Sequence, residues 1–239
     1  MRYALVDNNR IKAQSNLTGL CPGCSQIVIA KCGTQRVHHW AHKNGKNCDK
    51  WWESETEWHR LWKDNYPAEW QESFSVDQES GEIHIADVRT SAGLVIEFQH
   101  SNIMQQERES RERFYQNMVW VVNGLRLKND YKRFNKRITY QYLKEPNIFG
   151  VYDIENFLPV GWSNSPISVI FDFNGIDSSE NCNDAENFLY CLIPKRVGRI
   201  GILIKLTKTA FIKSTTTGKW QDRINVYLNK LILEEKEQG

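Results

Sequence analysis

Two short segments, Ala86-Asp87-Val88 and Val95-Ile96-Glu97-Phe98-Gln99, decide how this sequence folds. Both are typical of β-strands, and the turn between them contains a glycine. Because side chains alternate along a strand, Glu97 and Gln99 share one face, while Ile96 and Phe98 point into a core. Each strand therefore brings one carboxylate to a common edge, and paired carboxylates of this kind suit Mg²⁺ or Mn²⁺.

Two carboxylates that hold a hard divalent cation equip a protein to hydrolyse a phosphodiester bond. Such a cation activates water near neutral pH and relieves charge on the phosphate. A third group, usually a lysine, orients or deprotonates the water, and Gln99 occupies that position here. Its amide positions water or phosphate but cannot act as a base. We therefore expect Asp87 and Glu97 to bind the cation and Gln99 to orient the reactants.

The first 50 residues predict a small β-rich module with a zinc site. Residues 3–13 indicate a hairpin that turns at Asp7-Asn8-Asn9, and Cys21-Pro22-Gly23-Cys24 then predicts a knuckle with two sulfur ligands. The other ligands come from the His and Cys residues that follow: His38, His39, His42, Cys48 and, as a further alternative, Cys32. We favour His42 with either His39 or Cys48. The competing interpretation is a hairpin with reduced thiols and no metal.

Residues 51–63 predict a helix with one apolar and one polar stripe. The apolar stripe comprises Trp51, Trp58 and Trp62, and the polar stripe comprises Glu55, His59 and Lys63. Glu55 serves either the active site or the helix macrodipole. His59 either contacts phosphate or acts as a general base, or it is a hydrogen-bonded structural histidine. Ser54 and Glu57 have the spacing of a capping box.

Several of these motifs resemble one known family. The unit with Asp87, Glu97, Gln99 and Ser101 resembles the PD-(D/E)XK nuclease core, in the E-x-Q-x-S form of the competence protein CoiA-like family. Three other segments resemble the same family in the same order: Cys21-x-x-Cys24 with His39-Trp40-Ala41-His42, Glu55-Thr56-x-x-His59-x-x-x-Lys63, and Arg111-x-x-x-Tyr115. Thr56 replaces the serine that is usual in the family, and Glu57 adds an acid beside Glu55.

The resemblance implies an α/β protein with a restriction-endonuclease-like mixed sheet flanked by helices. It also implies a metal-dependent deoxyribonuclease that acts in competence, recombination or phage defence. Its expected protein partners are the recombination or defence proteins of those processes. Its substrate would be single-stranded, duplex or branched DNA, contacted by Lys63, Ser101, Arg111 and Tyr115. The alternative is a nuclease-derived DNA-binding or recombination accessory protein that cuts weakly or not at all; RNA is a third candidate substrate.

The rest of the chain predicts further strands and a basic segment. Residues 126–140 interleave cations with aromatic rings, which suits a phosphate backbone or serves as a solvated basic face; Lys132 and Arg133 are the candidate contacts. Residues 168–173, 188–193 and 200–212 predict strands, and residues 220–232 predict an amphipathic helix. We expect a zinc-ribbon-like module over 1–50, a nuclease core over 51–140 and a β-rich region over 141–239.

Composition agrees with an ordinary globular protein of the cytoplasm. Of the 239 residues, 40% are hydrophobic and 25% are charged, and no run approaches the roughly 20 apolar residues that span a bilayer. The polar amino terminus lacks a secretory hydrophobic region, so we expect reduced cysteines and no membrane contact. A net charge of +2 requires any DNA-binding surface to come from local clustering.

Overall fold

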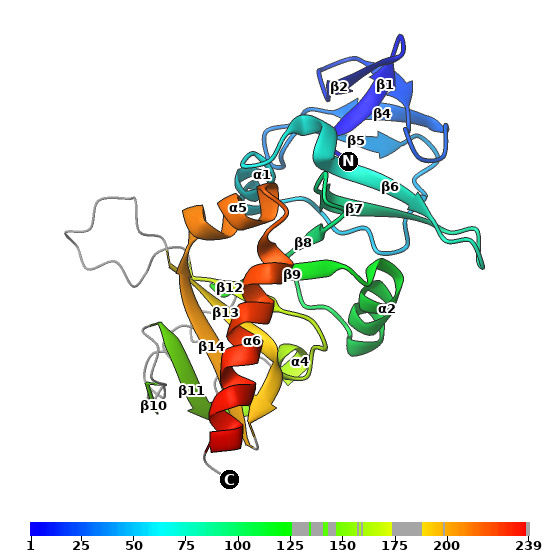
Figure 1. Ribbon diagram of the computed structural model, residues 1–239. Coiled ribbons are helices and arrows are strands. Elements are labelled where there is room, and N and C mark those ends of the chain that lie inside the picture. Colours follow the sequence, from blue (N-terminus) through cyan, green and yellow to red (C-terminus); the bar gives the residue numbers. More distant parts are fainter. Residues whose placement is uncertain are drawn as a thin grey trace, which may run out of the picture. The chain divides into compact units, whose positions relative to one another are not determined.

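The computed structural model describes residues 1–125, 134, 141–142, 147–156, 158, 160–173, 188–197 and 199–237. The chain divides into two compact units, Met1–Arg89 and Thr90–Gly239. Figure 1 labels their helices and strands. The three-part division expected from the sequence remains a prediction.

The first unit begins with an antiparallel five-stranded sheet in the order β2-β1-β3-β4-β5. Its strands are β1 (Tyr3–Val6), β2 (Asn9–Lys12), β3 (Thr18–Leu20), β4 (Ile27–Lys31) and β5 (His39–His42). The predicted hairpin is confirmed: Asp7 and Asn8 adopt φ angles of 49° and 62° between β1 and β2. Positive φ at both central residues is the requirement of a two-residue hairpin turn, which Asp and Asn meet at low cost.

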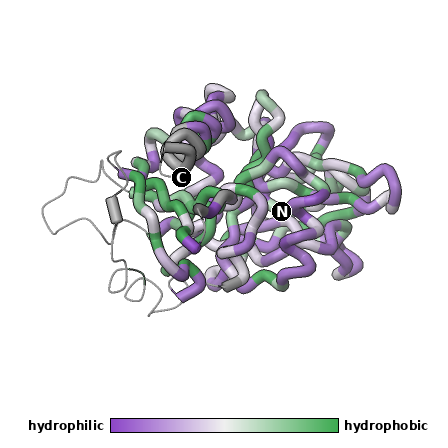
Figure 2. Tube along the Cα trace, turned by 60° about the horizontal axis from the view of Figure 1, so that its bottom comes forward, coloured by the Kyte–Doolittle hydropathy of each residue, from purple (hydrophilic) through white to green (hydrophobic). Residues whose placement is uncertain are grey.

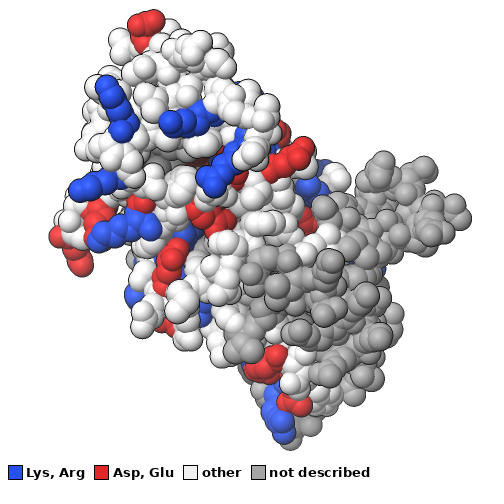
Figure 3. All heavy atoms as spheres, turned by 180° about the vertical axis from the view of Figure 1, so that it is seen from behind, with Lys and Arg blue, Asp and Glu red and all other residues white. Residues whose placement is uncertain are grey.

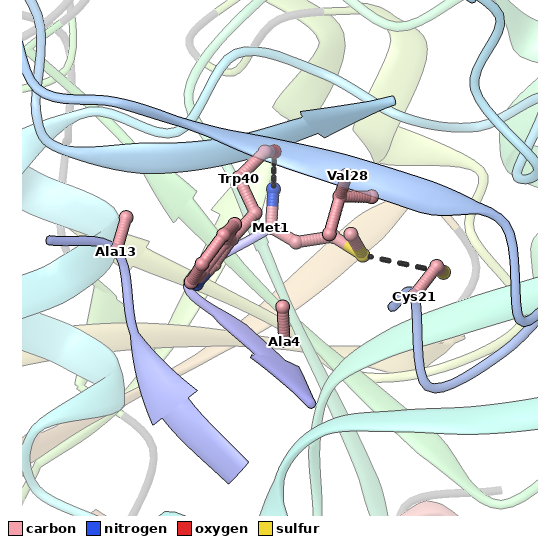
Figure 4. Close-up of a cluster of buried hydrophobic side chains, with 6 residues drawn as sticks. All are labelled: Met1, Ala4, Ala13, Cys21, Val28 and Trp40. Atoms are coloured by element: carbon pink, nitrogen blue, oxygen red, sulfur yellow. Dashed lines mark hydrogen bonds between the residues drawn. The ribbon is translucent and has the colours of Figure 1, made fainter. Parts of the chain in front are cut away.

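The core of this sheet is small. Figure 4 shows its six buried side chains, which are Met1, Ala4, Ala13, Cys21, Val28 and Trp40. Trp40 is 2% exposed, and its indole Nε1 donates to the Ile11 carbonyl at 3.1 Å. A core of this size supplies little stability on its own, and small modules with so few buried side chains commonly rely on a bound metal.

The remainder of the first unit comprises a short helix and a hairpin. Helix α1 (Glu57–Lys63) and the 3₁₀ turn η1 (Ala68–Trp70) precede the antiparallel strands β6 (Gln71–Val76) and β7 (Ile83–Arg89). The strand predicted at Ala86-Asp87-Val88 lies within β7. Thr56 caps α1, because its side chain accepts from the His59 backbone N–H, so the predicted capping box of Ser54 and Glu57 is wrong.

Trp51 lies outside helix α1, contrary to the stripe predicted for it. Its ring instead stacks on His84 of β7, with centroids 3.4 Å apart and an interplanar angle of 11°. The Trp51 backbone N–H donates to Asp49 Oδ1 at 2.8 Å, and Asp49 Oδ2 accepts from the Ile85 backbone N–H at 2.9 Å. These contacts hold residues 49–51 against β7, which prevents the helix from starting before Glu57.

The second unit contains a mixed sheet whose strands run in the order β10-β11-β14-β13-β12-β9-β8. Strand β9 is parallel to both β8 and β12, and the other neighbours are antiparallel. The strands are β8 (Val95–Gln99), β9 (Met118–Asn123), β10 (Gln141–Tyr142), β11 (Ile148–Tyr152), β12 (Val169–Asp172), β13 (Phe188–Val197) and β14 (Ile200–Thr207). Helix α2 (Gln105–Tyr115) crosses from β8 to β9, as parallel neighbours require. The mixed α/β class is thereby confirmed.

The carboxy-terminal part differs from expectation at one boundary. Residues 200–212 were predicted as a single strand, but β14 ends at Thr207 and helix α5 (Lys208–Thr216) follows. Thr207 causes the change, because its hydroxyl accepts from the Ala210 backbone N–H at 3.1 Å and so caps the helix. Helix α6 (Trp220–Glu237) confirms the predicted carboxy-terminal helix.

Two short helical segments, η2 (Ile154–Asn156) and α4 (Val160–Ser163), complete the described elements. Figure 2 shows hydrophobic and hydrophilic bands alternating along the tube, as expected of a chain that folds around interior strands. Among the residues that the structure describes, no helix has the length and apolar character needed to cross a membrane.

Candidate functional site

Four side chains of the first unit form a compact cluster of metal-ligating atoms. One atom each from Cys21, Cys24, His42 and Cys48 lies within 4.8 Å of the others. The Sγ atoms of Cys21 and Cys48 are 3.7 Å apart, and Cys24 Sγ is 3.2 Å from His42 Nε2. A zinc–sulfur bond of about 2.3 Å implies roughly 3.8 Å between two sulfurs of a tetrahedral site. The donor set and its spacing therefore fit a structural zinc ion.

Local backbone structure presents these ligands. A knuckle forms where the Ser25 N–H donates to the Cys21 carbonyl and the Cys21 N–H donates to the Gln26 carbonyl, both at 2.9 Å. His42 is the last residue of β5. Cys48 immediately precedes Asp49, whose carboxylate is held by backbone N–H groups of Trp51 and Ile85. The fourth ligand is thus positioned by the segment that packs against β7.

The thiols of the cluster share their protons unequally. A hydrogen bond with Cys48 lowers the pKa of Cys21 to about 5, against desolvation, and the same contact raises the pKa of Cys48. Burial raises the pKa of Cys24. The Cys21–Cys48 pair therefore favours one thiolate, and a bound zinc would favour the thiolate form of all three cysteines.

The structure distinguishes between the predicted alternatives for the fourth ligand. Cys48 lies in the cluster and His39 does not. His39 and His42 are three residues apart on β5, so alternation turns them to opposite faces of the strand. His39 Nδ1 instead lies 2.9 Å from the Val37 carbonyl oxygen. Cys32 is also outside the cluster.

A second polar cluster of the first unit surrounds Lys63. Its Nζ atom lies 2.6 Å from Glu55 Oε1, 3.4 Å from Glu72 Oε1 and 3.5 Å from Asp87 Oδ1. Helix α1 supplies the lysine, and β6 and β7 supply Glu72 and Asp87. We call these four side chains the Lys63 cluster. Two predicted site residues, Glu55 and Lys63, are thereby brought together with Asp87.

Charge in the Lys63 cluster is strongly coupled. Burial favours the neutral forms of Glu55, Lys63 and Glu72, yet the ion pairs override it. Lys63 and Arg60 lower the pKa of Glu55 to about 2. Lys63 likewise lowers the pKa of Glu72, while Glu72, Asp87 and Glu55 raise the pKa of Lys63. Lys63 therefore remains an ammonium ion and does not accept a proton.

His59 makes contacts that maintain the start of helix α1. Its Nδ1 accepts from the Thr56 backbone N–H at 3.1 Å, and its Nε2 lies 2.8 Å from Glu53 Oε1. Since Nδ1 accepts, the Nε2 proton is directed to Glu53. The side chain is 2% exposed. The geometry fits the structural alternative given for His59, and its catalytic role remains a prediction.

In the second unit, the predicted residues of β8 and α2 also contact one another. Arg111 Nη1 donates to Glu97 Oε2 at 3.0 Å, and the two side chains are 7% and 4% exposed. Gln99 Nε2 donates to the carbonyl and hydroxyl oxygens of Ser101, both at 3.2 Å. Tyr115 ends helix α2, where its ring packs edge-on against Phe114. Lys132 and Arg133 lie outside the described residues.

Sequence reasoning missed Glu72 as a member of the Lys63 cluster. Its carboxylate also accepts the backbone N–H groups of Arg2 at 2.6 Å and Tyr3 at 3.1 Å. Glu72 is 7% exposed and has a φ angle of 49°, which is unusual for glutamate. The available signal was a single acid at the start of what the structure shows to be β6, which on its own indicates no site.

The fold and the first cluster define a mixed α/β protein whose amino-terminal sheet carries a Cys₃His set suited to zinc. Residues 5–50 match the family model for the amino-terminal domain of the competence protein CoiA. This match supports the CoiA-like family and confirms the resemblance inferred from the motifs of that segment. It suggests a competence-related role. The predicted nuclease core lies outside the matched residues. No curated protein and no solved structure matches the chain significantly.

Proposed function

We propose that this protein is a divalent-metal-dependent DNA nuclease with a structural zinc module, acting on DNA during competence or recombination. The observation that carries the proposal is the Lys63 cluster. Carboxylates from three separate segments converge on one buried ammonium ion. Such a concentration of charge is costly to bury, and perturbed ionisable groups of this kind gather preferentially at functional sites.

Asp87 is the member of the cluster best suited to bind a cation. Its side chain is 23% exposed, against 10% for Glu55 and 7% for Glu72. A hydrated Mg²⁺ or Mn²⁺ usually keeps several waters and takes only one or two protein carboxylates, so it needs an accessible ligand. The proposal assigns Asp87 as the accessible ligand of the cation and Glu97, which is buried with Arg111, as the second ligand. The cation would activate water and relieve charge at the phosphate.

The remaining residues take roles that follow from their chemistry. Lys63 is held charged by its carboxylates, so it is suited to contact a phosphate oxygen. Gln99 is already fixed by Ser101 and so has a defined orientation for positioning water. Glu55 orients Lys63 at 2.6 Å and does not itself need to touch the substrate.

A non-cutting DNA-binding accessory protein is the second candidate function. It is favoured by the buried ion pair of Glu97 with Arg111, because a carboxylate already neutralised by a guanidinium binds a cation less readily. Gln99 in the position of a lysine favours it too, since loss of a general base lowers rates by about 10²–10⁴-fold.

The deciding experiment is cleavage of labelled single-stranded, duplex and branched DNA with Mg²⁺ or Mn²⁺, with matched RNA strands as competitors. We expect Asp87→Asn and Glu97→Gln each to reduce the rate by about 100-fold or more. Glu79→Gln and Glu109→Gln, which alter acids of the two units outside the assigned site, serve as controls and should retain activity. DNA binding without cleavage under every condition would instead support the accessory protein.

A further inference from the structure

Residues 1–50, which we call the zinc module, carry a larger positive net charge than the whole chain. Residues 1–50 contain eight Lys and Arg but only two Asp and no Glu, which gives +6, whereas the whole chain has +2. The remaining residues are therefore net negative. Figure 3 shows Lys and Arg side chains spread over the part of the molecule that this module occupies, with acidic side chains sparse there. A field of this kind attracts polyanions.

Strand register places several of these residues on one face of the sheet. Val28 and Trp40 point into the core, so their neighbours along β4 and β5 point outward. Lys31 pairs with His39, Ile29 with Ala41, and Ile27 with Leu20 of β3. Directly paired residues share a face. We call this surface the outer face; it comprises Leu20, Ile27, Ile29, Lys31, His39 and Ala41.

Cations lie at both ends of the outer face. At one end, Lys31 and His39 line a depression of about 630 Å³ together with Arg36. At the other end, Lys43 is joined to Ile27 by a hydrogen bond from its backbone N–H to the Ile27 carbonyl at 3.0 Å. Four residues of β4 separate the two ends, which is about 13 Å at 3.3 Å per residue. A short stretch of a single strand can span that length.

The cations and the apolar strip between them are accessible. Lys31, Arg36 and Lys43 are exposed, and none forms an ion pair with a carboxylate in the part of the chain that the structure describes. Between them, Leu20 is 45% exposed and Ile27 is 49% exposed. Arg2 and Lys50, by contrast, are paired with Asp64 and Glu82. The outer face therefore keeps its charge available for a partner.

We propose that the outer face binds single-stranded DNA, with phosphates on Lys31, Arg36 and Lys43 and with sugars and bases against the apolar strip. Unpaired strands expose the faces of their bases, whereas a duplex stacks them inside, so an apolar strip between two cationic ends favours a single strand. This inference rests on the proposed function, because it specifies the form of DNA that binds and the surface that binds it. It adds a binding surface separate from the carboxylates assigned to catalysis.

The test compares two triple variants of the full chain. Lys31→Ala/Arg36→Ala/Lys43→Ala removes the cations of the outer face, and Arg113→Ala/Lys213→Ala/Lys219→Ala removes three exposed cations of the second unit as a control. Affinity for a labelled single-stranded oligonucleotide is measured by fluorescence anisotropy over a salt series. Each lost phosphate contact reduces the slope of log affinity against log salt by about 0.7. We expect the first variant to lose about 2 from the slope and on the order of 100-fold in affinity at 0.1 M salt, and the control to change affinity less than about 2-fold.

Three results would overturn the proposal. If the wild type binds DNA and the first variant keeps its salt slope, the outer face is not the docking surface, whereas the proposed nuclease survives. If duplex competes as well as single strand through the same residues, the assignment to single strands is wrong. If the wild type binds no DNA, both this inference and the proposed function are wrong.

Two further measurements separate docking from misfolding and from catalysis. Zinc content of the triple variant reports whether its module is folded. If zinc is lost, the single variants Lys31→Glu and Lys43→Glu are measured instead, each with an expected slope change of about 0.7 from the lost phosphate contact and a further loss of affinity because the new carboxylate repels the strand. Cleavage by the folded variant should reach the wild-type rate at saturating DNA but require more DNA to do so; an unchanged requirement would contradict docking.

Discussion

Replacing Lys63 with methionine tests how the Lys63 cluster contributes to stability. The lysine side chain is 3% exposed, and its ammonium lies within 3.5 Å of three carboxylates. Methionine fills similar space but removes the ammonium shared by the buried Glu55 and Glu72, and Glu55 then keeps only Arg60 as a cationic partner. Removing one partner of a buried ion pair costs roughly 3–5 kcal/mol. Desolvation raises the pKa of Glu55, but the attraction of Lys63 and Arg60 outweighs it; the resulting pKa of about 2 instead of 4.5 corresponds to about 3 kcal/mol of net stabilisation.

The sign of the pH dependence is also determined. Because the folded-state pKa of Glu55 lies below 4.5, its stabilisation is fully present above about pH 4.5 and is lost as the pH falls toward 2. Without Lys63, burial favours the protonated form of the Glu55 carboxyl. Protonation in acid therefore reduces the destabilisation of the variant. The stability deficit of Lys63→Met should therefore be largest at neutral pH and shrink as the pH falls below about 4.

Urea denaturation followed by tryptophan fluorescence at pH 7 and pH 3.5 measures both effects. The matched control is Lys50→Met, because Lys50 pairs with Glu82 at the surface and its side chain is 72% exposed; we expect a loss below about 1 kcal/mol. Adding Glu55→Gln to Lys63→Met should recover part of the loss. A deficit under about 1 kcal/mol at pH 7, or one of equal size at both pH values, would refute the reasoning.

Three further predictions concern the zinc site and the core of the second unit. Protein purified without added metal should contain about one equivalent of zinc by elemental analysis. His42→Ala and Cys48→Ala should each reduce the zinc content below half an equivalent, while His39→Ala should leave it unchanged. Zinc loss in His39→Ala but not in His42→Ala and Cys48→Ala would exclude the Cys₃His set. Glu112→Ala should lower the free energy of unfolding by about 3–5 kcal/mol in urea titrations. It removes the carboxylate that pairs with the buried Arg108 and accepts hydrogen bonds from Trp120 and Ser165. Ser165→Ala removes only one of these hydrogen bonds and should lower the free energy of unfolding by about 1 kcal/mol. Gly124→Ala should lower the free energy of unfolding by about 1–3 kcal/mol in thermal denaturation, because its Cβ would lie 2.4 Å from the Phe173 ring. Gly33→Ala should leave stability nearly unchanged, because no atom lies within 4 Å of its Cβ position. Equal effects of the two variants would contradict the packing argument.

Features set by local alternation were predictable from the sequence. The strands β7 and β8 were found because apolar and polar residues alternate in short runs on either side of a glycine-containing turn. Helix starts were less predictable, because several residues compete to cap them. Ser54 and Glu57 have capping spacing, yet Asp49 and Trp51 are held on β7 and Thr56 becomes the cap. A contact with a distant strand decides this boundary, and spacing alone does not encode it.

The candidate site shows the same division between local and distant information. His39 could have been excluded as a zinc ligand from the sequence, because an interval of three along a strand reverses the face. Glu72 could not have been found, since its role depends on Lys63 of helix α1 and on backbone groups of Arg2 and Tyr3. The cations at the ends of the outer face are an intermediate case. Each was visible in the sequence, but the pairing of β4 with β5, the depression lined by Lys31 and Arg36, and the hydrogen bond from Lys43 to Ile27 are what bring them to one surface.

The ion pairs of the two predicted ligands bear on which function is correct. Asp87 lies 3.5 Å from Lys63, and Glu97 lies 3.0 Å from Arg111. Burying a carboxylate without a positively charged partner costs free energy. Lys63 and Arg111 therefore stabilise the fold when no divalent ion is bound. A metal must therefore compete with them, and a phosphate would assist it by drawing Lys63 and Arg111 away from the carboxylates. Under the nuclease hypothesis, the affinity for Mg²⁺ or Mn²⁺ should rise when DNA is bound; under the accessory-protein hypothesis, the ion pairs persist and DNA binding needs no divalent cation.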